Sequence, residues 1–519
     1  MRSFNTTGPV QPAKHYCIPP LERLDLDDVV ELIRGEKYFV LHAPRQSGKT
    51  STLLALRDLL NSGAAGDVRS VYASLEAGRT AGDDVEEAMR VILGELSARA
   101  RRTLGDESLE GFWRESLDTA GPHRALAEAL ARWAEAHARP LVLLLDEVDS
   151  LTGTPLLSLL SQIRSGYPDR PRHFPQSVAL AGIRDVQDYR APAVAGSPFN
   201  IKAESLRLGD FSEAKTYALL GQHTAETGQR FDDEALELVW SHTRGQPWLV
   251  NALAHDACFR HRPGRDRSRT ITGPAIREAR ERLIVRRETH LDYLAEKLHE
   301  ERVRRVIEPI LSGEARDEAS REDIDYVRDL GLIALAPPTR IANPIYGELI
   351  PRELTYPMEQ GLTEETAGYV DPDGALLVEK LMATFQRFFR EQSEQWAGRC
   401  DYAEAGPQLI LQGFLHRIVN GGGRLEREYG IGRGRTDLLI VWPRAGGEDR
   451  FAVECKVAHR GREQAVREGL RQTAGYLDRL GTASGHLVVF DRDPAKPWEE
   501  KIYRRDGEHE GKAITVWGM

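Results

Sequence analysis

The chain has 519 residues, of which 41% are hydrophobic and 29% charged, and its net charge at pH 7 is −10. That length predicts several domains, about three or four. With this net negative charge, the overall electrostatic field of the protein does not attract nucleic acid. Any contact with nucleic acid must therefore be made by a local group of residues. No amino-terminal signal pattern is present, apolar runs such as Leu141 to Leu145 are too short to cross a bilayer, and the four cysteines lack metal-binding or disulfide spacing. We therefore expect a cytoplasmic protein without a membrane partner.

Near the amino end, an apolar run that predicts a buried strand, Lys37 to His42, leads directly into Ala43-Pro44-Arg45-Gln46-Ser47-Gly48-Lys49-Thr50 and then into a helical run. This order predicts a phosphate-binding loop, in which backbone N–H groups at the helix start surround phosphates. We expect Ser47, Gly48, Lys49 and Thr50 to bind a nucleotide, with Lys49 adding charge and the Thr50 hydroxyl binding Mg²⁺. Ala43 stands where such loops usually begin with glycine, which would matter if the position needed a positive φ angle.

A second apolar run, Leu141 to Leu145, ends in Asp146-Glu147-Val148-Asp149. This is a Walker B pattern, in which Asp146 holds the water shell of Mg²⁺ and Glu147 polarises the attacking water. The pattern therefore predicts nucleotide hydrolysis as well as binding. No guanine-specific Asn/Thr-Lys-x-Asp motif is present, which favours ATP, and no helicase motifs are apparent, which favours a switch over a translocating motor.

Two later segments resemble parts of AAA-type and STAND-type ATPases. The run from Ser177 to Asp185 resembles their sensor strand, which makes Arg184 a candidate for contact with the γ-phosphate, although a salt bridge to Asp185 is an open alternative. The segment from Thr243 to Asn251 carries Gly-x-Pro at a helix start, which resembles the lid near the adenine in STAND ATPases and would place Pro247 there. Ordinary helix capping explains the same proline.

The middle of the chain is predicted to be helical from about 206 to 300. Residues 301–355 then resemble a winged helix, with two short strands around Pro337-Pro338, a module that often binds the DNA major groove. Its second helix, Arg321 to Leu332, carries four carboxylates that would repel phosphates, so we favour a structural role. Tyr356 to Asp373 is predicted to be a linker, and a helix from Ala375 to Trp396 follows.

Near the carboxyl end, Gly434-Arg435-Thr436-Asp437 precedes an apolar run, and Glu454-Cys455-Lys456 lies inside a second run, Phe451 to Val457. The Gly/Pro-rich turn between the runs predicts an antiparallel hairpin. Residues two apart on a strand share a face, so Glu454 and Lys456 project together. Gln472 and Tyr476, four apart on a helical pattern, share a helix face. Two hard carboxylate ligands for Mg²⁺ and a nearby cation are what phosphodiester hydrolysis needs.

This set of residues resembles the PD-(D/E)XK nuclease superfamily, in particular the branch that carries the additional glutamine and tyrosine. The resemblance implies that Asp437 and Glu454 bind Mg²⁺ and that Lys456, Gln472 and Tyr476 belong to the catalytic site. The superfamily's first core helix often adds an acidic residue, here Glu404, with Asp401, Glu426 and Glu428 as rivals. The proline that usually precedes the aspartate is replaced by Thr436. Several arginines lie near the site, but they are interleaved with glutamates.

The order of the parts resembles bacterial and archaeal AAA-like ATPases fused to PD-(D/E)XK domains. The expected fold is multidomain α/β: a P-loop AAA-like ATPase core at 1–205, a helical lid at 206–300, a winged helix at 301–355, a linker and helix at 356–396, and an α/β nuclease domain at 397–519. The resemblance implies an ATP-regulated, Mg²⁺-dependent nuclease, with DNA favoured over RNA, a role in defence against foreign DNA, and self-association through the ATPase domain. The alternative is a signalling or scaffold ATPase whose carboxyl domain binds nucleic acid or a partner without cleavage.

Overall fold

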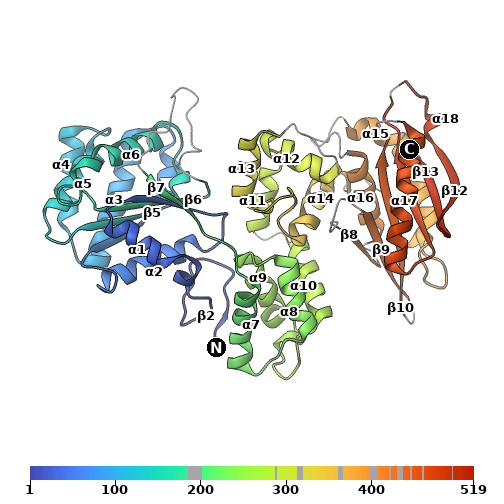
Figure 1. Cartoon of the computed structure of the whole chain (residues 1–519), viewed down its shortest axis with the longest axis horizontal. Coiled ribbons are helices and arrows are strands. Elements are labelled where there is room, and N and C mark those ends of the chain that lie inside the picture. The colour runs from blue at the N-terminus through green and yellow to red at the C-terminus, as the bar shows by residue number, and fades with distance from the viewer. Residues whose placement is uncertain are drawn as a thin grey trace. The chain divides into compact units, whose positions relative to one another are not determined.

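The structure is a computed structural model that describes residues 1–184, 202–286, 289–312, 319–359, 366–397, 406–419, 422–428, 437–444, 447–458, 461–493 and 495–519 (Figure 1). The chain forms two compact units. The first comprises Met1–Arg286 and Arg328–Gly331, and the second comprises Arg287–Val327 and Leu332–Met519. No helix in the described ranges is long and apolar enough to span a membrane.

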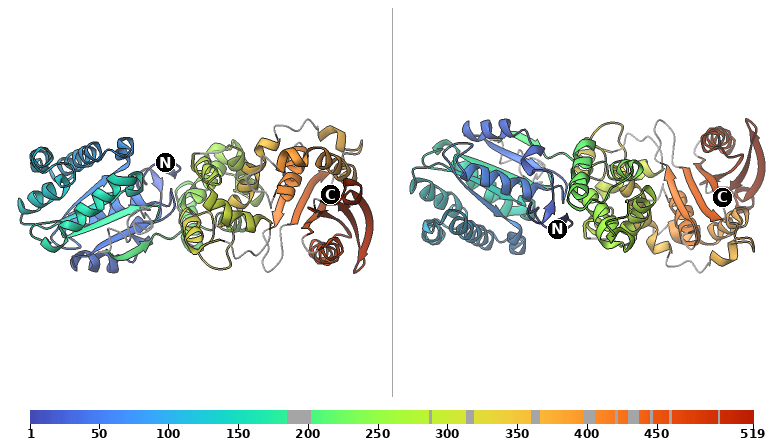
Figure 2. Two further views of the ribbon diagram at one scale, coloured as in Figure 1. Left: turned by 90° about the horizontal axis from the view of Figure 1, so that it is seen from above. Right: turned by 90° about the horizontal axis from the view of Figure 1, so that it is seen from below.

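The first unit is built on a parallel sheet of five strands in the order β4 (Arg69–Ser74), β5 (Leu141–Asp146), β6 (Ser177–Gly182), β3 (Tyr38–His42) and β7 (Lys202–Arg207). The central strands are apolar along most of their length, as expected for strands with helices on both faces (Figures 1 and 2). One face carries α1 (Leu26–Arg34) and α2 (Lys49–Asn61), and the other carries α3 (Val85–Leu104), α4 (Ser108–Ala120), α5 (Ala125–Glu135) and α6 (Gly153–Ser165).

The parallel arrangement brings the two predicted nucleotide motifs to one edge of this sheet. The loop before α2 leaves the carboxyl end of β3, and Asp146 is the last residue of β5, with β6 between the two strands. Because all five strands run the same way, their carboxyl ends lie at one edge, where ligands bind in open α/β sheets.

Four helices follow the sheet in the segment predicted as a lid, and are called the lid helices here: α7 (Glu213–Thr227), α8 (Asp233–Thr243), α9 (Pro247–His255) and α10 (Gly273–Arg286). Ser212 and Asp232 cap the first two by accepting hydrogen bonds from backbone N–H groups. The amino-terminal strands β1 (Ser3–Phe4) and β2 (His15–Tyr16) pair with each other and pack into the lid core through Phe4 and Tyr16. The start of the chain thus belongs with the lid helices and not with the parallel sheet.

The second unit contains α11 (Thr289–Lys297), α12 (Glu301–Ser312), most of α13 (Arg321–Asp329) and α14 (Pro344–Glu359). Where two short strands were expected around Pro337-Pro338, the structure has a single bridge between Ile333 and Ile341. The expected linker also differs, because α14 continues to Glu359, and a short turn, Thr366–Tyr369, leads to α15 (Val378–Ala397). Phe385 and Phe389 of α15 are buried in the hydrophobic core beneath the carboxyl-terminal sheet, so this helix is part of that domain's core.

A mixed sheet of six strands forms the carboxyl part of this unit, in the order β12 (Tyr503–His509), β13 (Lys512–Gly518), β11 (Ser484–Phe490), β10 (Gly447–Val457), β9 (Asp437–Arg444) and β8 (Arg424–Glu428). β8, β9 and β10 form an antiparallel meander, which contains the predicted hairpin. β11 is parallel to β10, and the crossover between them is α17 (Arg462–Leu480). α15 and α16 (Gly406–Val419) cover one face of the sheet and α17 covers the other (Figure 2).

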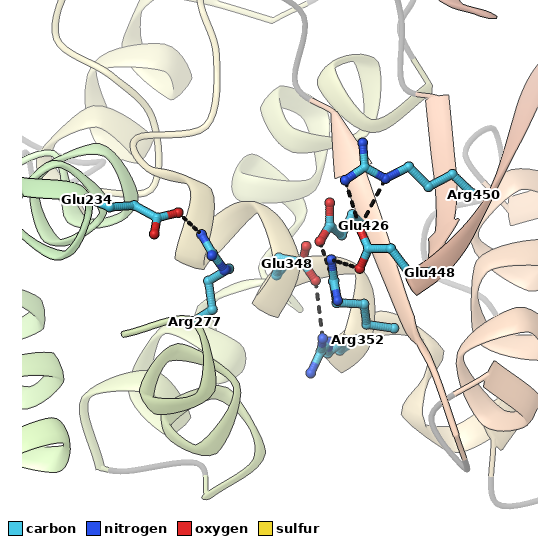
Figure 3. A network of polar contacts seen from close by, with 8 residues as sticks. Glu234, Arg277, Glu348, Arg352, Glu426, Glu448 and Arg450 are labelled. Carbon is cyan, nitrogen blue, oxygen red and sulfur yellow. Dashed lines mark hydrogen bonds and ion pairs between the residues drawn. The ribbon is translucent and has the colours of Figure 1, made fainter. Parts of the chain in front are cut away.

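An ion-pair network joins the outer strands of the meander. The Arg424 guanidinium contacts Glu426 at 2.6 Å and Glu448 at 3.1 Å, and Arg450 contacts Glu448 at 2.7 Å (Figure 3). On α14, Arg352 pairs with Glu348 one turn away. This network links β8 to β10, and within it the Glu426 carboxylate is paired with Arg424.

Candidate functional site

A cavity of about 580 Å³ opens at the carboxyl edge of the first sheet, within the first unit. Its wall combines three parts of that unit: the loop from β3 to α2, the end of β5, and an amino-terminal segment with the lid. The last group includes residues from Asn5 to Val10 together with Arg23, Phe211, Pro247, Trp248 and Asn251. A cavity of this size lies within the range of small-ligand sites.

The loop before α2 has the backbone that phosphate binding needs. Gly48, the N-cap of α2, has φ 94, a left-handed conformation that favours glycine. The buried Lys49 ammonium donates hydrogen bonds to the carbonyl oxygens of Ala43 at 2.6 Å and Pro44 at 2.9 Å. The Ser47 hydroxyl also donates to Pro44, at 2.8 Å. Ala43 does not adopt a positive φ, so the missing glycine costs the loop no strain.

Three oxygen-bearing side chains meet where the loop faces β5. The Thr50 hydroxyl donates to Oδ2 of Asp146 at 2.6 Å, and the Tyr72 hydroxyl donates to the same oxygen at 3.1 Å. Burial, and then the Asp146 charge, raise the pKa of Tyr72, so the phenol stays protonated. Hard oxygen donors are the ligands that Mg²⁺ prefers, so Thr50 and Asp146 fit a nucleotide-bound Mg²⁺. Tyr72 was not foreseen, because nothing in a strand sequence shows which hydroxyl will reach the carboxylate.

Glu147 lines the same cavity in an environment suited to a general base. Its backbone lies in the left-handed region, with φ 56, a strained position for a residue other than glycine. Burial raises the pKa of the Glu147 carboxyl, and the nearby charges of Glu76, Asp146 and Asp149 raise it further. A carboxylate with a raised pKa binds a proton more readily, which suits the activation of water.

The two remaining predicted nucleotide residues have different positions. Pro247 begins α9 and lines the cavity, and Gln246 caps the helix by accepting a hydrogen bond from the Leu249 N–H at 2.6 Å. The capping interpretation is therefore confirmed, and the position of Pro247 near the adenine stays a prediction. Arg184 lies two residues beyond β6 and is not among the residues that line the cavity. Arg23 and Arg45 line it instead.

Glu454 and Lys456 form a buried ion pair on β10 of the second unit. The Lys456 ammonium donates to Oε1 of Glu454, and the two residues are 3% and 2% exposed. Both project from the face of the sheet that α17 covers, while Val453 and Cys455 belong to the core on the other face. Removing two charges from water is costly, so such a pair is weak evidence for stability, and it makes this position a candidate for a functional site.

The helix that covers this face brings the other two predicted residues to it. Tyr476 on α17 is buried in the small core that contains Ala452, a neighbour of Glu454 on β10. Gln472 lies one turn earlier, and its Oε1 is buried without a hydrogen-bond partner in the described part of the chain. The structure therefore places Lys456, Glu454, Gln472 and Tyr476 on facing surfaces of β10 and α17.

The two other predicted carboxylates are Asp437 and Glu404. Asp437 begins β9, where its backbone is described, and Glu404 lies outside the described residues, as does Asp401. Among described side chains, no group of three or more His, Cys, Asp and Glu residues is close enough to hold a metal ion.

Comparison with known proteins identifies the first site. Residues 33–189 match the family model described as "AAA domain", so the chain contains an AAA-type P-loop ATPase domain that binds ATP. No curated protein matches the chain.

Several solved structures are similar to this chain. The Walker-type ATPase PABY2304 of Pyrococcus abyssi is 14% identical, with a TM-score of 0.46, and the match covers 67% of this chain and 99% of that one. The Aeropyrum pernix ORC2 protein is 13% identical, with a TM-score of 0.40 and coverages of 64% and 93%. RuvB of Thermotoga maritima is 16% identical, with a TM-score of 0.34 and coverages of 63% and 93%.

Proposed function

We propose that this protein is an ATP-regulated, Mg²⁺-dependent nuclease of the PD-(D/E)XK type, with DNA as its expected substrate. The observation that supports this proposal most strongly is the buried Glu454–Lys456 pair, on the face of the sheet that is covered by α17 with Gln472 and Tyr476. A charged surface patch would be exposed to water, whereas this pair is enclosed by a helix that carries the remaining residues of the motif.

Strand register supports the addition of Asp437 to this site. β9 and β10 are antiparallel, and the last pair of their ladder is Leu438 with Val453. The next positions in the same register are Asp437 and Glu454. Directly opposed residues of an antiparallel pair have Cα atoms about 4.5–5.5 Å apart and belong to one face. The register thus supports a role for Asp437 beside Glu454.

The same register favours one of the rival acidic residues. β8 pairs with β9 so that Glu428 is opposite Asp437. Positions 428, 437 and 454 therefore form one row across three neighbouring strands. Glu426, two residues earlier, is bound to Arg424 at 2.6 Å. We infer that Glu428 is a better candidate than Glu426 for an additional acidic residue.

These residues suit phosphodiester hydrolysis. A bound Mg²⁺ would supply an activated water and neutralise charge on the phosphate. Glu454, with Asp437, provides oxygen ligands of the kind that this ion prefers. Lys456 holds a positive charge at the carboxylate, where it can orient a water or offset developing negative charge. Gln472 and Tyr476 can position the nucleic acid backbone through hydrogen bonds.

The ATPase domain gives this site a regulator. Thr50, Asp146 and Glu147 surround a nucleotide site whose wall includes lid residues, so nucleotide binding and hydrolysis can change the lid. We infer that the nucleotide state decides whether nucleic acid reaches the second unit's site. A role in defence against foreign DNA fits this combination.

The test is a cleavage assay with single- and double-stranded DNA and RNA, with Mg²⁺, and with ATP present, absent or replaced by a non-hydrolysable analogue. Asp437→Ala should abolish cleavage and leave ATP hydrolysis unchanged. Asp449→Ala is the matched control, because Asp449 lies on the same hairpin but pairs with Arg444 at its far end. It should cut normally. Cleavage by the Asp437 variant, or no cleavage by the wild type under any condition, would favour a binding domain instead.

A further inference from the structure

Arg23 places a half-buried cation in the wall of the nucleotide cavity. It ends a short 3-10 turn, Pro20–Arg23, that precedes α1. A Cβ atom built on Gly48 would lie 2.7 Å from Nη1 of Arg23, so the guanidinium touches the P-loop backbone at the start of α2. The P-loop backbone at this point surrounds the α- and β-phosphates of a bound nucleotide.

The guanidinium also joins the P-loop to the beginning of the lid. Nη1 of Arg23 donates to the carbonyl oxygen of Ser47, and Nη2 donates to the carbonyl oxygen of Gly209, four residues before α7. The ring of Phe211 lies 5.1 Å from the guanidinium carbon. In addition, Lys215 of α7 donates to the Glu22 carbonyl oxygen at 2.6 Å. The turn that carries Arg23 is therefore bound to both parts.

Much of the hydrogen-bonding capacity of Arg23 is unused. A guanidinium has five N–H donors. In the described part of the chain its hydrogen bonds go only to two carbonyl oxygens, and its Nε is buried without a partner. Burial lowers the pKa of Arg23 to about 10, while the Asp210 charge acts against that shift. The side chain still carries its charge at neutral pH, and the nearby Asp210 carboxylate balances part of it, while the unused N–H donors remain costly to desolvate.

We propose that Arg23 binds the α- or β-phosphate of the nucleotide and, through Gly209, transmits nucleotide occupancy to the lid helix α7. The ligand's phosphate would supply acceptors for the unused donors, because guanidinium donors match phosphate oxygens in pairs. The position beside Gly48 sets this role apart from that of a γ-phosphate sensor. A diphosphate contact strengthens ADP and ATP binding alike, whereas a γ-phosphate sensor strengthens ATP binding only.

The first test is calorimetric binding of ADP and ATP to the full chain. Arg23→Gln should weaken both nucleotides by a similar factor, about tenfold or more. Arg23→Lys keeps the charge but loses the paired donors, so it should weaken both by less. Lys215→Met is the matched control, because it removes the neighbouring bond to Glu22 and leaves Arg23 in place. It should bind both nucleotides like the wild type.

The second test measures hydrogen exchange of α7 amides at saturating ADP. ADP should slow exchange in the wild type and in Lys215→Met, but not in Arg23→Gln. The proposal is overturned if Arg23→Gln binds ADP like the wild type, if it weakens ATP alone, or if it weakens ADP no more than Lys215→Met does. Wild-type protection of α7 in the saturated Arg23→Gln variant would overturn the transmission to the lid. If Arg23→Gln does not fold, Arg23→Lys decides by the same criteria.

Discussion

At the scale of single residues, the Glu454–Lys456 pair gives a stability prediction. Lys456→Met removes the buried cation and leaves the Glu454 carboxylate without it, which should lower the free energy of unfolding by about 3–5 kcal/mol. The double variant, Glu454→Leu with Lys456→Met, removes both charges and should recover most of that loss. Hydrogen exchange of β10 amides measures this unit separately from the first. A double variant as unstable as the single one would contradict the pairing.

Glu147 gives a prediction about pH. As a general base it must be ionised, and its pKa lies above the ordinary carboxyl value because of burial and the charge of Glu76. ATP hydrolysis should therefore rise as pH increases through that raised pKa. Glu147→Gln should lower hydrolysis by about 10²-fold or more while ATP still binds. Glu76→Gln removes a negative neighbour, lowers the pKa of Glu147 and should move the acid limb of the rate profile to lower pH.

Two measurements check the predictions for Glu147. Steady-state rates of ATP hydrolysis at several pH values give the acid limb of the rate profile, and calorimetry tests whether Glu147→Gln still binds ATP. Wild-type turnover by Glu147→Gln would remove this residue from the hydrolytic step. An unmoved acid limb in Glu76→Gln would assign the limb to another group.

At the scale of elements, the position of α17 against the sheet gives a matched pair of glycine predictions. A Cβ atom on Gly469 would lie 2.5 Å from Leu487 of β11, so Gly469→Val should push the helix away from the sheet, lower stability and reduce cleavage through Gln472 and Tyr476. Gly475, on the same helix, has open space at that position. Gly475→Ala should raise stability by up to about 1 kcal/mol and leave cleavage unchanged.

Thermal unfolding of both variants, with cleavage measured below the transition, checks this prediction. Equal effects at the two glycines would show that helix propensity dominates and that the close approach of α17 to Leu487 is unimportant. A destabilised Gly469→Val variant that cuts normally would show that Gln472 and Tyr476 tolerate displacement.

The elements that sequence could predict were those with a strong local pattern. Such patterns occur in the apolar strand before Ala43, the apolar strand that ends at Asp146, the hairpin that carries Lys456, and the helix with Gln472 and Tyr476, and the structure contains all four. The extension of α14 to Glu359 was missed because glycines and prolines nearby suggested a linker. Arg23 was missed because its role depends on contacts with Ser47 and Gly209, which are 24 and 186 residues away. No local pattern reports contacts of that kind.

At the scale of the whole molecule, regulation of cleavage by ATP requires coupling between two binding events. If nucleotide state controls access of nucleic acid, then nucleic acid must change the affinity for ATP by the same factor by which ATP changes the affinity for nucleic acid. Couplings of this kind are typically about 5–150-fold. The net charge of −10 favours such control, because the protein's overall field gives nucleic acid little attraction of its own.

The two changes in affinity can be measured in a variant that carries both Asp437→Ala and Glu147→Gln, in which neither nucleic acid cleavage nor ATP hydrolysis should occur. The affinity for ATP is measured with and without a DNA duplex, and the affinity for the duplex with and without ATP. We expect two equal factors above about fivefold, because linkage makes them one quantity. Lys49→Ala in the same background should weaken ATP binding and abolish the effect of ATP on the duplex, since Lys49 is the P-loop cation. Factors of one in both directions would mean that the ATPase does not control binding at the second unit's site.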